Sequence, residues 1–273
     1  MTIKVASTSL LSLNPKPAYF ADARHGARSM GRETVCHVRV LDELSLAGST
    51  QCLRLLLESS EAEAVIPGQY CVLSDNRREP RPFNYVTLPG RERRFIVAAS
   101  QPGPPLSVTD RLVYHGPFGA GWPLPLGVSR LLVFASEGGI LTVVAAIDEF
   151  ACWMPWVRVT LIHDPSSPLR LPDDCRSWLR SLGLLSDAGL DSCPLERLRE
   201  HLSKQVPDLV YCAAPSPLAQ RAARLCLWHG VPAHRIWVRD EMCLPSAGGG
   251  SIPDPDGPVR RFDRFNGCSQ ARP

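Results

Sequence analysis

The sequence is poor in lysine and in net charge. Lys4, Lys16 and Lys204 are its only lysines, and every other residue among the 30 basic ones is arginine. Because 27 acidic residues oppose them, the net charge is only +3, which argues against nucleic acid as the main partner. With 44% apolar and 21% charged residues, the 273 residues are typical of one large or two ordinary globular domains.

Closely spaced cysteines are also absent. The ten cysteines include no C-x2-C or C-x4-C pair, and the two nearest, Cys212 and Cys226, are 14 residues apart. A zinc ribbon or an iron–sulfur loop needs ligands close together in sequence, so neither is built locally. Because no signal peptide follows Met1, we expect buried free thiols in a reducing compartment and a cytoplasmic protein.

No apolar run is long enough to span a bilayer. The longest stretch, residues 131–147, is interrupted by Glu137 and two glycines, so we expect no membrane insertion. Motifs of serine hydrolases, zinc proteases, P-loop proteins and kinases are missing too. The sequence therefore assigns no catalytic residue.

The first half of the chain predicts a small antiparallel β-barrel. Apolar or β-branched runs separated by proline and glycine clusters predict six short strands, at 34–41, 50–57, 69–73, 83–88, 94–98 and 111–114. Short strands separated by turn residues at even intervals are typical of a small antiparallel barrel.

The second half predicts an α/β domain with a parallel sheet. Strand-like runs lie at 130–135, 157–162, 209–212 and 235–238, and helix-like stretches lie at 140–150, 175–182, 194–205 and 218–229. Strands that alternate with helices favour a parallel sheet. The predicted organisation is an N-terminal arm at 1–30, a barrel domain at 31–125, an α/β domain at 126–240 and an extended tail at 241–273.

Seven different short motifs follow one another in a specific order along these two domains. The barrel carries PGQY at 67–70, RPFN at 81–84 and GPFG at 116–119, and the second half carries SEGGI at 136–140, CAAP at 212–215, EMC at 241–243 and DGPV at 256–259. Over residues 32–260 this order resembles the ferredoxin–NADP reductase superfamily of flavoproteins. Within it, the sequence resembles the dihydroorotate dehydrogenase electron-transfer subunits and related hydrogenase subunits. The resemblance implies a flavin-binding barrel followed by a nicotinamide-nucleotide-binding-like domain.

For the barrel, the resemblance implies an FAD site. Arg81 would neutralise the pyrophosphate, and Phe83, in place of a tyrosine, would stack on the isoalloxazine. Asn84, in place of a hydroxyl residue, would donate a hydrogen bond near flavin N5. Gly116 belongs to the motif that closes the barrel.

For the second domain, the resemblance places Gly138 and Gly139 in the phosphate loop and Cys212 at the strand end near the nicotinamide. However, the charge of Glu137 would repel a phosphate, and Ala213 narrows the approach to the strand. We therefore expect no tight NAD(P)H binding.

The EMC segment at 241–243 and the DGPV segment at 256–259 resemble the two flanks of a [2Fe–2S] loop, but the cysteine ligands between them are missing. No further cysteine lies between Cys243 and the DGPV segment at 256–259. One thiolate cannot hold the cluster, so we predict none.

Two functional hypotheses follow from the resemblance. The first is a flavin-linked oxidoreductase subunit that passes electrons between FAD and a partner protein, as the pair Arg81 and Phe83 suggests. The second is a degenerate reductase-like subunit with a structural or regulatory role in a larger complex, favoured by the changed phosphate loop, the alanines after Cys212 and the missing cluster ligands. Glu137 argues against a stand-alone NADPH-dependent flavin reductase.

Overall fold

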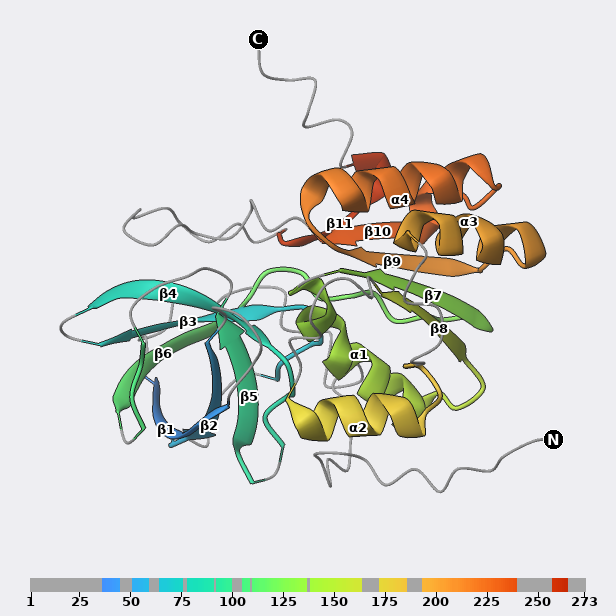
Figure 1. The fold of residues 1–273 in the computed structure, drawn as a ribbon. Helices are drawn as coiled ribbons and strands as arrows, with labels where there is room; N and C mark the ends of the chain where they lie inside the picture. The colour runs from blue at the N-terminus through green and yellow to red at the C-terminus, as the bar shows by residue number, and fades with distance from the viewer. Residues whose placement is uncertain are drawn as a thin grey trace, which may run out of the picture.

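The computed structural model describes residues 36–44, 51–58, 64–75, 78–90, 92–99, 105–108, 110–136, 138–163, 172–185, 193–239 and 257–264. These residues form a β-barrel that lies beside a layered α/β unit (Figure 1). A closed antiparallel barrel followed by a largely parallel sheet is the predicted fold class, which is confirmed.

Six strands close the barrel in the order β1-β2-β5-β4-β3-β6. They are β1 (Cys36–Leu44), β2 (Cys52–Leu57), β3 (Tyr70–Asp75), β4 (Arg78–Tyr85), β5 (Arg94–Ala99) and β6 (Arg111–Phe118). Alternate residues face inward, because successive side chains on a strand point to opposite faces. Leu53 and Leu55 of β2 thus pack in the interior with Phe95 and Val97 of β5.

The second sheet has the strand order β11-β10-β9-β7-β8. Its strands are β7 (Arg130–Ala135), β8 (Arg158–His163), β9 (Leu209–Ala213), β10 (Ile236–Arg239) and β11 (Val259–Arg261). The first four run parallel and β11 pairs antiparallel with β10. The almost uninterrupted apolar sequence of β7 suits a strand buried on both faces, and five of its six residues are buried.

Helices cover both faces of this sheet (Figure 1). They are α1 (Gly139–Trp153), α2 (Asp173–Ser181), α3 (Pro194–Lys204) and α4 (Ser216–Trp228), with a short 3-10 turn, η2 (Ala233–Arg235), before β10. Helices α3 and α4 pack on one face, against Leu132 and Phe134. Helix α1 lies on the other face, between the sheet and the barrel, and α2 lies beyond it.

Helix α1 joins the two units into one core. Eight consecutive residues at 140–147 are all buried, so the helix is apolar around its circumference, as expected of a helix buried on all sides. The same apolar cluster contains Val86 and Ile96 from the outer face of the barrel and Val133 from the sheet.

Trp122 fixes the chain where it leaves the barrel. Its ring stacks on Tyr211 with a centroid distance of 4.7 Å and an interplanar angle of 19°. The indole Nε1 donates a hydrogen bond to the carbonyl oxygen of Thr142 on α1 at 2.9 Å. Trp122 therefore contacts the sheet and α1 at the same time.

Part of the predicted extended tail folds onto both units. Residues 259–261 form β11 at the edge of the sheet, because Val259 and Phe262 are buried. The amide of Ala120 donates a hydrogen bond to the carbonyl oxygen of Gly257 at 2.8 Å. The DGPV segment thus has a structural use here, although Asp256 lies outside the described residues.

Within the described part of the chain, no helix is both long and apolar enough to cross a membrane.

The contacts of Trp122 predict a large effect of its truncation. Trp122 is 1% exposed, so W122A should lower the free energy of unfolding by about 3–5 kcal/mol, the usual cost of removing a buried aromatic ring. Urea unfolding followed by circular dichroism measures this. The control W156A removes an exposed ring and should change stability by no more than about 0.5 kcal/mol. Equal effects of the two substitutions would contradict this account of the junction.

Candidate functional site

Asn84 of β4 faces the second domain. It pairs with Tyr70 of β3 and with Ala98 of β5, and Ala98 belongs to the core that the barrel shares with α1. The Asn84 side chain is 6% exposed. The predicted flavin-facing amide therefore lies on the barrel face that meets the α/β unit.

Arg81 and Phe83 occupy the opposite face of the same strand. Phe83 pairs with Cys71, and both pack inside the barrel. The guanidinium carbon of Arg81 lies 5.3 Å from the centre of the Phe83 ring, a cation–π geometry. Because neighbouring residues on a strand point in opposite directions, the structure separates Phe83 from Asn84. The sequence prediction had placed both against one ring without applying this alternation.

Arg239 contacts the candidate site residue Asn84, and the sequence analysis did not identify it. It ends β10 and is 1% exposed. Its Nη1 donates a hydrogen bond to the carbonyl oxygen of Gly68 at 2.6 Å, and its Nη2 donates to Oδ1 of Asn84. A basic residue directly after the apolar run at 236–238 was the only available signal. The residue separations of 171 and 155 left its partners invisible in the sequence.

The backbone at Gly68, whose carbonyl oxygen accepts the hydrogen bond from Arg239, has little conformational freedom. Gly68 has a φ of +94°, and a Cβ at this position would lie 2.7 Å from Cδ1 of Trp122. Only glycine combines such a φ with so little space. The amide of Trp122 also donates to the carbonyl oxygen of Pro67 at 2.8 Å, so the PGQY turn is held against the junction between the domains.

The predicted phosphate loop is tightly packed at one of its two glycines. A Cβ on Gly139 would lie 1.8 Å from the carbonyl oxygen of Ala213, whereas a Cβ on Gly138 would meet nothing within 4 Å. The amide of Ser136 donates to that same carbonyl at 3.1 Å. Gly139 thus lets α1 approach the end of β9, and Glu137 lies outside the described residues.

Cys212 packs away from the barrel. It is fully buried with Phe134 and Cys226 in the core beneath α3 and α4. Burial raises the pKa of its thiol well above the ordinary value, with a smaller contribution from Cys226. The cofactor contact of Cys212 stays a prediction, and no thiol surface is exposed for it.

Gly116 has a structural setting in β6. Its φ is +153°, and a Cβ there would lie 3.1 Å from Cβ of Cys71 and 3.3 Å from the hydroxyl oxygen of Tyr85. This position lets β6 cross close to β3 and β4 where the barrel closes.

The fold is shared with known proteins, although no protein-family model matches the chain. The structure of a NADH-dependent reduced ferredoxin–NADP oxidoreductase is similar with a TM-score of 0.62 at 15% identity, over 89% of this chain and 96% of the other. A flavohemoglobin from Malassezia yamatoensis with bound FAD and heme is similar with a TM-score of 0.56 at 16% identity, over 75% of this chain and 59% of the other. The chain has the ferredoxin–NADP reductase-like fold.

One relative is similar to this chain in sequence as well. It is a probable dihydroorotate dehydrogenase B (NAD(+)) electron transfer subunit from Methanopyrus kandleri, 26% identical over 218 residues, which cover 74% of this chain and 81% of the relative. The resemblance to the ferredoxin–NADP reductase-like flavoproteins, which the motifs indicated, is confirmed.

FAD is the group that the reductase-like fold implies, and the amide of Asn84 fits it. The amide of Asn84 is a donor of the kind that a flavin ring edge accepts. Arg239 supports this amide through Oδ1, whereas Arg81 lies over the Phe83 ring on the inward face of β4 and is 5% exposed. Phe83 does not fit the stacking role in this position, because it is 0% exposed in the barrel core. Among the described residues, no group of three or more His, Cys, Asp or Glu could hold a metal.

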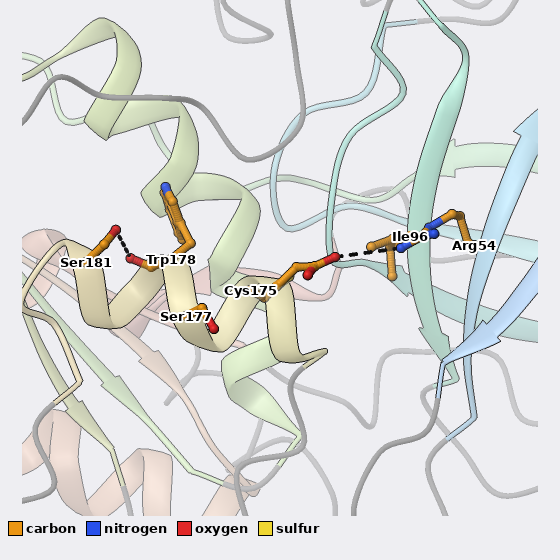
Figure 2. Close-up of a pocket in the computed structure, with 7 residues that line it drawn as sticks. Arg54, Ile96, Cys175, Ser177, Trp178 and Ser181 are labelled. Carbon is orange, nitrogen blue, oxygen red and sulfur yellow. Dashed lines mark hydrogen bonds and ion pairs between the residues drawn. The ribbon is translucent and has the colours of Figure 1, made fainter.

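A separate pocket of about 400 Å³ opens between the barrel and α2 (Figure 2). Its lining residues are Arg54, Ile96, Asp174, Cys175, Ser177, Trp178 and Ser181. At its edge Nη2 of Arg54 lies 3.9 Å from Oδ2 of Asp174. Burial raises the pKa of Cys175 to about 12, so the thiol is protonated and a poor nucleophile. The pocket touches none of the predicted site residues.

The two loop glycines predict a contrast that tests the packing of α1 on β9. G139A should lower the free energy of unfolding by about 1–3 kcal/mol, because the new methyl group has no space beside Ala213. G138A adds the same methyl group at a position with a φ of −66° and no neighbour, and it should change stability by at most about 0.5 kcal/mol. Thermal unfolding measures both, and a G138A effect as large as that of G139A would contradict the described loop.

Proposed function

We propose that the chain is a flavin-linked electron-transfer subunit that passes electrons between FAD and a partner protein. The observation that carries this proposal is the position of Asn84. This residue of β4 lies on the face where the barrel meets the α/β unit. The similarity to an electron transfer subunit supports the same role and favours it over the degenerate alternative.

Three residues are proposed to hold the flavin. Arg81 would bind the pyrophosphate, Asn84 would donate to the ring, and Arg239 would hold Asn84 in place. FAD, when bound, supplies the one- and two-electron chemistry that the side chains lack. The stacking role of Phe83 is kept only as a prediction, since the ring would have to leave the barrel core.

The second domain is proposed not to bind NAD(P)H tightly. The sequence argument from Glu137 supports this, because its charge would repel a phosphate. The electrons would then be exchanged with another protein. We also propose that no iron–sulfur cluster is present, on the sequence argument from Cys243 and the missing ligands.

A cytoplasmic location is proposed on the cysteines. None of the eight cysteines in the described part of the chain forms a disulfide, which suits a reducing compartment. The partner is proposed to be another subunit of an oxidoreductase complex, on the strength of the relative's name.

The visible spectrum of the purified protein tests the proposal. Flavin bands in near-stoichiometric amount, which disappear on reduction with dithionite, are expected. A colourless protein that cannot be loaded with FAD would rule the proposal out and favour the degenerate alternative. Fast flavin reduction by NADH or NADPH would disprove the statement on the second domain alone.

The Arg81 contribution can be measured by FAD titration. R81M keeps the apolar stem and removes the charge, and it should weaken FAD binding at least about tenfold, or about 1.4 kcal/mol. R111A removes an exposed guanidinium of β6 and should leave FAD binding unchanged. Fluorescence titration gives both dissociation constants, and equal values for R81M and wild type would remove Arg81 from the site.

A further inference from the structure

Arg239 connects the second domain to the amide of Asn84. Both of its terminal nitrogens are used on the barrel, one on the backbone of Gly68 and the other on Oδ1 of Asn84. A guanidinium carries donors only. The atom of Asn84 that faces Arg239 is therefore the acceptor.

This contact orients the Asn84 amide. An asparagine side chain has an acceptor, Oδ1, and a donor, Nδ2, at opposite corners of one rigid plane. With Oδ1 directed at Arg239, Nδ2 is directed away from it. A hydroxyl, by contrast, rotates and can donate in several directions, so a serine or threonine at this position would need no such partner.

The geometry points to Arg239 as a positioning residue: by holding Oδ1 of Asn84, Arg239 makes Asn84 present its N–H donor, not its carbonyl, to the flavin. The inference rests on the proposed function and deepens it. Because Arg239 comes from the α/β unit and Asn84 from the barrel, the oriented donor exists only while the two units are docked.

Both the backbone and the side chain of Arg239 are fixed by neighbouring residues. The backbone of Arg239 pairs with Val259 of β11, and the bond to Gly68 ties the side chain to a turn that Trp122 fixes. Burial strengthens such a charge-assisted hydrogen bond, because little water competes for it. Arg239 is thus placed before any ligand arrives.

A double-mutant cycle on FAD affinity tests the inference. The variants are R239M, which keeps the stem without donors, N84S, and R239M combined with N84S. R239M should raise the FAD dissociation constant about tenfold when Asn84 is present, which corresponds to about 1.4 kcal/mol. In the N84S background it should raise the constant less than about threefold, since the rotatable hydroxyl needs no orientation.

N84D separates the donor from the packing. The carboxylate keeps an acceptor for Arg239 and adds an ion pair, but it loses the N–H group. N84D should therefore unfold at a temperature no lower than wild type and still bind FAD about tenfold more weakly. If R239M does not fold, the FAD affinities of N84D and N84S are compared instead, and they test whether the flavin needs the N–H donor of Asn84.

The outcomes are distinct. An equal loss from R239M in both backgrounds would reduce Arg239 to a structural residue and overturn the inference, while flavin binding itself would stand. N84D with unchanged FAD affinity would overturn it as well. A wild-type protein that binds no FAD would instead overturn the proposed function, and the inference with it.

Discussion

The burial of helix α1 on all sides is the constraint on which the remaining structure depends. Because residues 140–147 are buried, the helix needs apolar neighbours on both the sheet side and the barrel side. The shared cluster supplies them, and Trp122 seals the junction through Thr142 and Tyr211. A large apolar interface of this kind disfavours free movement of the two units, so groups from both can form one polar site.

That site combines a residue from each unit. The barrel contributes Asn84 and the carbonyl of Gly68, and the sheet contributes Arg239 at the end of β10. The carboxyl ends of strands in an open α/β sheet are a general location for ligands. The phosphate loop lies at the same edge, but Gly139 is packed against Ala213 there.

The sequence predicted the fold well and the site only in part. The six barrel strands and the strand–helix alternation followed from local patterns, because periodicity and turn residues are local signals. Strand alternation could have separated Phe83 from Asn84, but the motif was interpreted as a unit. Arg239 could not be linked to Asn84, since only the tertiary structure joins positions 155 residues apart. The strand at 259–261 was missed because it is three residues long and has one buried residue.

Hydrogen–deuterium exchange with and without FAD tests most directly whether the flavin binds at the face between the two units. The account predicts that FAD slows exchange in peptides that contain the 67–70 turn, β4 and the end of β10, because these segments surround Asn84 and Arg239. Peptides from α3 and from the exposed end of α4 should exchange at unchanged rates. Protection confined to the pocket beside α2, or no protection at all, would contradict the account.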